Sequence, residues 1–209
     1  MSPTDELVCV VDDDQSIRRG LRRLFKSAGY MAEMFASAED YLARKIYAGP
    51  ICLVLDVRMP GVNGLDLQQV LEARGAWEQI VFITGHADVP NCRQAMKQGA
   101  VDFLLKPFDD VELIEAVARA FVRSKETIRQ RAERRAAREM IEKLTPREFE
   151  VLRLVIVGLL NKQIAEELKT AEKTVKVHRG RVMQKLGLTS VPDLVRLSQT
   201  AGVLPARPA

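Results

Sequence analysis

The stretch Ile51-Cys52-Leu53-Val54-Leu55-Asp56 decides the fold, because five apolar residues in a row end in a single carboxylate. The chain then turns through Met59-Pro60-Gly61. A continuous apolar run of this length, bounded by turn residues, is typical of a strand buried on both faces of a parallel sheet. Ligands of open parallel sheets bind outside the carboxyl ends of the strands. The sequence therefore places Asp56 where a functional site is expected.

Three further apolar runs end in residues that suit the same site. The polar residues that follow these runs are Asp12, Asp13 and Asp14 after 7–11, Thr84 after 80–83, and Lys106 after 103–105. Because the carboxyl ends of parallel strands share one edge of the sheet, we expect acids, a hydroxyl and a lysine to meet in one acidic crevice. Any one of these residues alone is more often a turn, cap or solvated residue, so the hypothesis depends on their combination.

Strands and helices alternate over residues 1–121. The expected strands are 7–11, 31–36, 51–55, 80–83 and 101–105, and the expected helices are 15–28, 39–46, 65–73, 91–98 and 110–122. Strict alternation predicts an α/β domain built on a doubly wound, five-stranded parallel sheet.

The rest of the chain is predicted to be helical. Residues 122–143 are rich in Arg, Glu and Ala and indicate a charged helical linker or an extension of the preceding helix. Residues 144–204 predict an all-α domain of four helices, which begins with the capping sequence Thr145-Pro146-Arg147-Glu148. Asn161 is expected to cap the second of these helices. Residues 205–209 are expected to form a disordered tail.

Composition limits the classes of protein and partner. Residues 1–121 hold 13 Lys/Arg and 18 Asp/Glu, a balance of −5, whereas residues 122–209 hold 19 Lys/Arg and 10 Asp/Glu, a balance of +9. This asymmetry suggests two modules, of which the basic one could meet nucleic acid or an anionic membrane surface. No apolar run approaches the roughly 18–20 residues of a membrane span. Three cysteines without metal-like spacing and an N-terminus without a signal-peptide pattern favour the cytoplasm.

Converging carboxylates repel one another, but a hard divalent cation among them relieves that repulsion. Mg²⁺ prefers oxygen ligands and often bridges to a phosphoryl group. Asp12, Asp13 and Asp56, with the backbone carbonyl of Arg58, are the candidate ligands. A lysine, a hydroxyl and a metal around an aspartate suit phosphoryl transfer onto that aspartate.

The first 121 residues resemble the receiver domain of bacterial two-component response regulators. The matching segments are 10–14, 55–64, 83–86 and 103–108. The resemblance implies a CheY/flavodoxin-like fold, Asp56 as phosphoacceptor, Mg²⁺ held by the acids, and Thr84 and Lys106 in contact with the phosphoryl group. It also implies a cis peptide bond between Lys106 and Pro107 and a switch role for Thr84 and Phe103. A protein of this kind is not an enzyme, apart from its own phosphorylation and dephosphorylation.

Helix 172–186 carries a second candidate function. Val175, Val182 and Leu186 lie on one face of it and predict a core stripe. The residues placed to meet DNA are Lys173, Thr174, Lys176, Val177, His178, Gly180, Arg181, Gln184 and Lys185. Such side chains bond to base edges and phosphates in a major groove. A basic helix with a solvated outer face is the alternative that the residues alone leave open.

Segments 144–148, 161–165 and 174–178 resemble the LuxR-type helix-turn-helix domain, and the whole chain resembles the NarL/FixJ class of response regulators. Within that class, segments 85–90 and 174–179 are similar to the FixJ and styrene-catabolism regulators. The implied partners are a sensor histidine kinase, double-stranded DNA and a second copy of the chain after phosphorylation, with RNA polymerase as a further candidate. Arg93 and Lys97 are candidate dimer contacts.

Two other functions compete with this interpretation. An aspartate-nucleophile phosphatase of the haloacid dehalogenase type also places Asp at a strand end beside Mg²⁺. Such enzymes need a second acid two residues after the nucleophile, where this chain has Arg58. A receiver joined to an RNA-binding helical domain is the other alternative, and preference for hairpin RNA over duplex DNA would support it.

Overall fold

The structure is a computed structural model that describes residues 6–85 and 89–206. Contacts divide the chain into two compact units, Met1–Ile128 and Arg129–Ala209. The boundary falls inside the segment expected to be a linker. Residue 86, a histidine near the predicted crevice, lies outside the described residues, as do 207–209 of the predicted tail.

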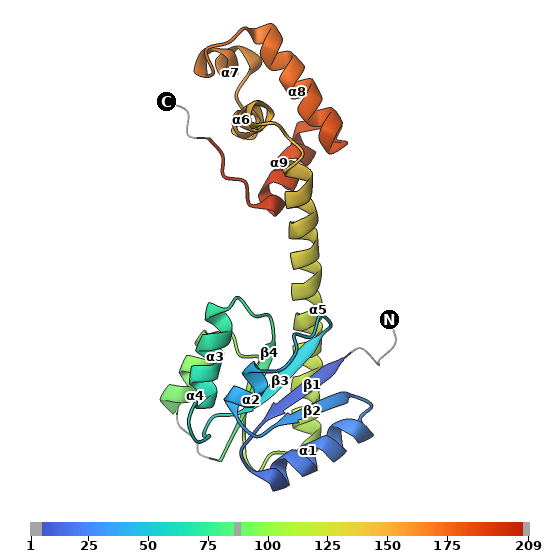
Figure 1. Ribbon diagram of the computed structural model, residues 1–209, viewed down its shortest axis with the longest axis vertical. Coiled ribbons are helices and arrows are strands. Elements are labelled where there is room, and N and C mark those ends of the chain that lie inside the picture. Colours follow the sequence, from blue (N-terminus) through green and yellow to red (C-terminus); the bar gives the residue numbers. More distant parts are fainter. Residues whose placement is uncertain (1–5, 86–88, 207–209) are drawn as a thin grey trace. The chain divides into compact units, whose positions relative to one another are not determined.

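The first unit is a five-stranded parallel sheet in the order β2-β1-β3-β4-β5, with helices on both faces (Figure 1). Its strands are β1 (Leu7–Val11), β2 (Met31–Phe35), β3 (Ile51–Asp56), β4 (Gln79–Thr84) and β5 (Asp102–Leu105). Its helices are α1 (Gln15–Ser27), α2 (Ala38–Leu42), α3 (Gly64–Ala73), α4 (Val89–Lys97) and α5 (Asp110–Ile141). The predicted doubly wound sheet is confirmed, and most element bounds differ by one to three residues at an end.

Continuous apolar runs form the central strands because both sheet faces are covered. Every residue of β1 and β3 is buried. Alternate residues of each strand contribute to two separate cores. One core packs under α2, α3 and α4 and the other under α1 and α5. Burial of these runs holds the carboxyl ends of β1 and β3 side by side, with Val11 opposite Leu55 in the register.

Gly64 fixes the chain immediately after Asp56. Its N–H donates to the carbonyl of Val57 at 3.0 Å, at the first position of α3. A Cβ at residue 64 would lie 2.2 Å from the carbonyl oxygen of Asp56, which is backbone and cannot move aside cheaply. Only glycine therefore lets α3 start this close to the end of β3.

A Gly64→Ala variant is expected to lower the free energy of unfolding by about 1–3 kcal/mol. Alanine would gain up to about 1 kcal/mol of helix propensity, but the backbone clash outweighs it. Trp77 is the single tryptophan and lies in the first unit, so denaturation followed by its fluorescence measures the effect. Gly20→Ala in α1 is the control: a Cβ there meets nothing within 4 Å, so stability should rise. Equal stability of the two variants would contradict the steric argument.

The charged segment after residue 121 continues α5 without a break to Ile141, so the predicted linker is an extension of that helix. Ion pairs one turn apart stabilise its solvated part. Arg129 pairs with Glu133 at 2.9 Å and Arg135 with Glu139 at 2.8 Å. Each such pair contributes about 0.3–0.5 kcal/mol. A helix without an apolar stripe can persist here because charge pairs and propensity support it.

The second unit packs four further helices onto the end of α5. They are α6 (Pro146–Val155), α7 (Asn161–Glu167), α8 (Glu172–Leu186) and α9 (Val191–Ala201). The predicted capping box of α6 is confirmed by bonds between Thr145 and Glu148 in both directions. The N-cap positions of α7 and α8 are Leu160 and Ala171, and neither side chain supplies a capping bond.

The chain after α9 stays on the second unit at least to residue 206. Arg153 of α6 donates to the carbonyl of Leu204 at 3.0 Å, and its own carbonyl accepts from the N–H of Ala206 at 3.2 Å. The first two residues of the predicted tail, 205 and 206, are therefore close to α6. None of the described helices combines the length and the apolar character that a membrane crossing requires.

Candidate functional site

The acidic crevice forms where β1, β3 and β5 end. The Lys106 ammonium lies between two carboxylates, 2.7 Å from Oδ2 of Asp12 and 3.2 Å from Oδ2 of Asp56. Asp12 is fully buried and Asp56 is 7% exposed. The predicted meeting of strand-end residues is thus present, and Asp56 is the less buried of the two acids.

Burial and charge act in opposite directions on these groups. Burial raises the pKa of Asp56, the Lys106 charge lowers it in part, and the Asp12 charge raises it again. For Lys106, burial alone would lower the pKa of the ammonium, but its hydrogen bond to Asp12 and the two acidic charges raise it. Lys106 therefore stays cationic and helps to keep the carboxylate of Asp56 ionised, which is the nucleophilic form.

Asp13 completes a set of oxygens that fits a hard cation. One carboxylate oxygen each from Asp12, Asp13 and Asp56 lie within 4.8 Å of one another. Asp13 is exposed, so its carboxylate faces the open side of the crevice. Carboxylate oxygens are ligands that Mg²⁺ takes, together with waters and phosphoryl oxygens. Asp14, the third acid of the run, instead caps α1 by accepting from the N–H of Ser16.

Backbone bonds position the remaining candidates of the first unit. The N–H of Lys106 donates to the carbonyl of Thr84 at 2.7 Å, which joins the ends of β4 and β5. Thr84 is buried, and the Lys106–Pro107 bond is cis, as the resemblance implied. Phe103 is half-buried, with its ring 6.1 Å from that of Phe82. Arg58 is exposed beside Asp56, whose Oδ1 accepts its N–H at 3.4 Å.

Sequence reasoning missed Arg18, which also contributes to the crevice. Its Nη1 donates to the backbone carbonyl of Asp12 at 2.6 Å. This bond ties α1 to the end of β1. A basic residue on α1 four residues after its acidic cap was the available signal, but a surface helix carries many such residues.

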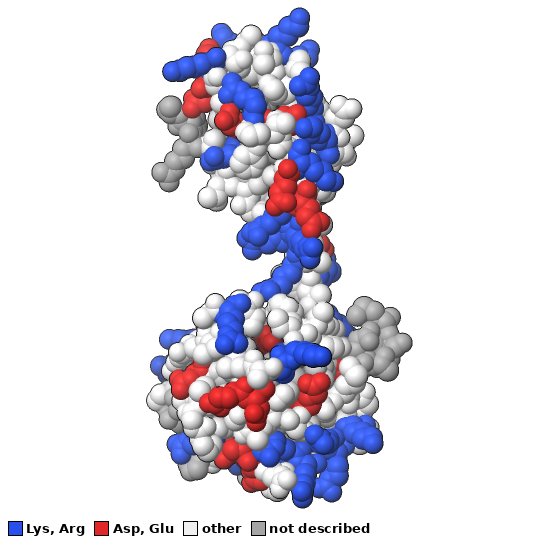
Figure 2. All heavy atoms as spheres, in the orientation of Figure 1, with Lys and Arg blue, Asp and Glu red and all other residues white. Residues whose placement is uncertain are grey.

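Most of the predicted DNA contacts lie on the outer face of α8. Val175, Val182 and Leu186 are buried, so the predicted core stripe is confirmed. The exposed candidates are Lys173, Thr174, Lys176, Val177, Gly180, Arg181, Gln184 and Lys185. In Figure 2, Lys and Arg side chains gather along α8. Ala171 is the N-cap of α8, and its side chain accepts no hydrogen bond from the first backbone N–H groups of the helix.

Two predicted contacts have other surroundings. His178 is half-buried, and its Nδ1 is buried with no hydrogen-bond partner among the described residues. Lys185 donates to Oε2 of Glu148 at 2.7 Å and so joins α8 to the start of α6. Sequence reasoning also missed that Arg179 donates to Oδ1 of Asn161 at 3.0 Å, which links α8 to α7. Asn161 was expected to cap α7 and instead is its first residue.

The Glu148–Lys185 pair makes the stability of the second unit depend on pH. The hydrogen bond from Lys185 and that from the Thr145 N–H lower the pKa of Glu148 from 4.5 to about 2. A carboxyl group whose pKa is lower in the folded than in the unfolded chain stabilises the fold at pH values above its unfolded pKa. For Glu148, this stabilisation is lost as the pH falls from 4.5 towards 2.

A Glu148→Gln variant is expected to lose about 1–3 kcal/mol of stability at neutral pH and to become less sensitive than the native chain to acid over this interval. Trp77 does not report on this unit, so amide hydrogen exchange of α6 and α8 is the measurement. Glu150→Gln is the control, because Glu150 is exposed and, among the described residues, its ion pair is with Arg147, three residues before it. Equal losses of stability in the two variants would show that the Glu148–Lys185 pair stabilises the unit no more than an exposed ion pair does.

Two family models match separate parts of the chain. Residues 8–118 match the response regulator receiver domain. The chain is a response regulator. Residues 142–198 of the regulator match the LuxR family of bacterial regulatory proteins. The α/β unit is thus its receiver and the helical unit its DNA-binding domain, in the arrangement of the NarL/FixJ class, so the regulator belongs to a two-component system.

Relatives of the regulator are similar over almost their full length. Nodulation protein W of Bradyrhizobium diazoefficiens is 48% identical over 202 residues, which are 96% of this chain and 88% of that protein. The transcriptional regulatory protein FixJ of Azorhizobium caulinodans is 44% identical, over 95% and 94% of the two chains. The response regulator StyR superposes with a TM-score of 0.77 at 45% identity, over 93% of this chain and 98% of that one.

Arg93 and Lys97, the candidate dimer contacts, are exposed on α4 of the receiver. Their role in dimerisation stays a prediction. A response regulator has a histidine kinase and DNA as partners, which agrees with the predicted ones.

Proposed function

We propose that Asp56 accepts a phosphoryl group from a histidine kinase and that this phosphorylation controls DNA binding by α8. The observation that carries the proposal is the placement of the Lys106 ammonium against both Asp12 and Asp56, at 2.7 and 3.2 Å. That arrangement leaves a partly accessible carboxylate next to a fixed positive charge. A phosphatase of the haloacid dehalogenase type needs a second acid two residues after the nucleophile, and this chain has the exposed Arg58 at that position. This difference favours a phosphoryl group that persists on Asp56 over its rapid hydrolysis.

Asp12, Asp13 and Asp56, with the Arg58 carbonyl, would hold Mg²⁺. When bound, the metal would neutralise charge on the phosphoryl oxygens. The carboxylate oxygen of Asp56 forms a P–O bond as the bond from phosphorus to the donor's imidazole nitrogen breaks, and that nitrogen keeps the electron pair. Lys106 pairs with the negative charge left on the transferred group, and the Thr84 hydroxyl donates to one of its oxygens.

The bond to Thr84 draws this residue toward the crevice, and Phe103 fills the space that it leaves. The surface of α4, β5 and the first part of α5 changes as a result. We infer that two copies then associate there, with Arg93 and Lys97 among the contacts. Dimerisation would place two α8 helices on a two-part DNA site in the cytoplasm, where contact with RNA polymerase can follow.

The test selects bound fragments from a genomic DNA library with the full-length chain, with and without a small-molecule phosphodonor and Mg²⁺. We expect the same duplex sites to be enriched more strongly when both are present, and we expect the sites to have two similar halves. Equal enrichment with and without phosphodonor would overturn the phosphorylation control. Preference for a structured RNA over duplex DNA would overturn the assignment of α8.

A further inference from the structure

The second unit has a pocket between the end of α5, the start of α6 and the chain after α9. Its volume is about 740 Å³, within the range of roughly 300–1,000 Å³ that is usual for small-molecule sites. The described residues that line it belong to α5, to α6 and to the segments that follow α5 and α9. The pocket therefore takes no residue from the outer face of α8, and we call it the α5–α6 pocket.

The apolar lining of the α5–α6 pocket forms one continuous surface. Ile141 and Ala201 line the pocket and belong to the buried core of the second unit. Leu144, Phe149 and Val203 also line it, and they are half-buried against the same core. Half-buried apolar side chains around a cavity leave apolar surface that a ligand can cover. An apolar molecule in the pocket would therefore extend the core of the unit.

Hydrogen bonds hold the outer wall of this pocket in place. Nε of Arg138 donates to the carbonyl of Ala201 at 3.2 Å, and Nε of Arg153 donates to the carbonyl of Leu204 at 3.0 Å. The N–H of Ala206 returns a bond to the carbonyl of Arg153 at 3.2 Å. The side chain of Leu204 lines the pocket although it is 77% exposed. Because the wall is already fixed, a ligand would lose little affinity to ordering it.

Two arginines of α5 lie together at the edge of the pocket that Gly202 forms. A Cβ at residue 202 would lie 3.2 Å from Nη2 of Arg134 and 3.9 Å from Nη2 of Arg138, so both guanidinium groups surround one point. Arg134 has no hydrogen-bond or ion-pair partner among the described residues, and among them Arg138 uses its Nε alone. The other N–H groups of both side chains can pair with the two oxygens of a carboxylate.

The charges around the pocket favour an anion. Arg138 and Arg153 line it, and Arg134 lies at its edge. Glu142 supplies the carboxylate of the described lining; it is exposed and forms no ion pair with another described residue. Three cations against one carboxylate leave the pocket positive. A neutral apolar molecule would leave these cations unused, and a small polar anion would leave the apolar surface uncovered.

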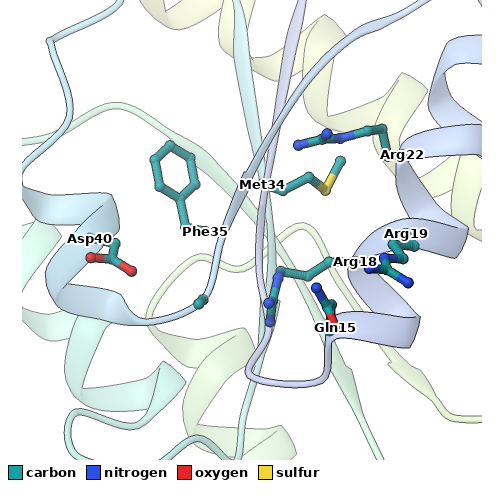
Figure 3. A pocket seen from close by; sticks show the side chains of 8 residues that line it. Gln15, Arg18, Arg19, Arg22, Met34, Phe35 and Asp40 are labelled. Carbon is teal, nitrogen blue, oxygen red and sulfur yellow. The ribbon is translucent and has the colours of Figure 1, made fainter.

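The receiver also has a cavity, between α1 and the start of α2, but its lining differs in kind (Figure 3). Met34 and Phe35, its larger apolar residues, pack into the two separate cores on opposite faces of the sheet. They share no apolar surface for one ligand. The α5–α6 pocket joins an apolar surface to a cationic edge, and it is therefore the better candidate for a site.

We propose that the α5–α6 pocket binds a small organic acid. Its carboxylate would pair with Arg134 and Arg138, and its apolar body would lie against Phe149, Val203 and Leu204. The site shares no lining residue with the acidic crevice of the receiver, and it leaves the outer face of α8 free for DNA.

The test titrates the full-length chain at neutral pH in a calorimeter with octanoate and 2-naphthoate, two acids with a flexible and a planar body. Acetate is the probe without an apolar body, and 1-octanol is the probe without a carboxylate. We expect at least one of the two acids to bind with a Kd below about 1 mM, and acetate and 1-octanol to bind at least about tenfold more weakly. Failure of both acids, or equal affinity for acetate or 1-octanol, would overturn the proposal.

A matched pair of variants tests the cationic edge. Arg134→Gln should weaken binding of the acid about three- to tenfold, because it removes charge-assisted bonds to the carboxylate. Arg135→Gln removes the same charge from the next residue of α5, which pairs with Glu139 and does not line the pocket. This control should change affinity less than about twofold. Equal effects of the two variants, or none from the first, would remove the arginines from the site and refute the proposal.

A second pair tests the apolar wall without disturbing the core. Leu204→Ser should weaken binding of the acid at least about threefold, because it removes apolar surface from the pocket. Leu160→Ser is the control, since Leu160 is 68% exposed in the same unit and does not line the pocket. Thermal unfolding followed by circular dichroism checks that both variants fold as the native chain does. A loss of affinity that is equal in the two variants, or absent from Leu204→Ser, would place the acid outside this pocket.

Discussion

An Asp56→Asn variant is expected to incorporate no phosphoryl group from a small-molecule phosphodonor, a loss of more than about 100-fold. The amide has the size of the carboxylate but neither its charge nor its nucleophilic oxygen. Intact-protein mass spectrometry after incubation with phosphodonor and Mg²⁺ measures the effect. The enrichment of DNA sites by phosphodonor should disappear in the same variant.

Two further variants distinguish a nucleophile from its neighbours. Asp13→Asn should still be phosphorylated, but only at raised Mg²⁺ concentration, because it removes an exposed ligand and leaves Asp56 in place. Asp110→Asn, at the exposed start of α5, should behave as the native chain. Native labelling of Asp56→Asn would place the acceptor on another residue.

Loss of two cations from α8 is expected to have the largest effect on DNA binding. Lys176 and Arg181 are exposed and have no hydrogen-bond or ion-pair partner among the described residues. Replacing both with Ala removes two contacts of about 1–3 kcal/mol each, so affinity for a selected site should fall by at least about 30-fold. The dependence of affinity on salt should become shallower, because fewer counterions are released. Fluorescence anisotropy of a labelled duplex at several salt concentrations measures both.

The control removes two cations from the same unit away from the outer face of α8. Lys143 and Arg196 are exposed, and Arg196 already pairs with Asp193 at 2.8 Å. Their replacement with Gln should change affinity less than about threefold. If both pairs of substitutions weaken binding alike, net charge and not the outer face of α8 determines binding.

Local patterns were sufficient for much of the fold. The run Ile51–Leu55 predicted a strand covered on both faces, and β3 is buried throughout. The Thr145 capping box depends only on residues three apart, and it is present. The segment after residue 121 could be a separate linker or an extension, and the extension is what forms, since no Gly or Pro interrupts α5.

Pairings between distant residues were not predictable in the same way. Lys185 was assigned to DNA from its place on α8, yet it bonds to Glu148, 37 residues earlier. Arg179 and Asn161 meet only because α7 and α8 pack together. Helical rotation tells which residues share a face, but not which other helix covers the edge of that face.

The sequence by itself determined the sheet, the alternation of elements, the set of polar strand ends and the core stripe of α8, because each depends on neighbours in the chain. Only the tertiary structure decided how these groups act on one another. It placed the Lys106 ammonium within 3.2 Å of Asp56 and left Asp13 at the open side of the crevice. The physical reason is that burial and distance set charge interactions, and both arise only when segments far apart in the chain pack together.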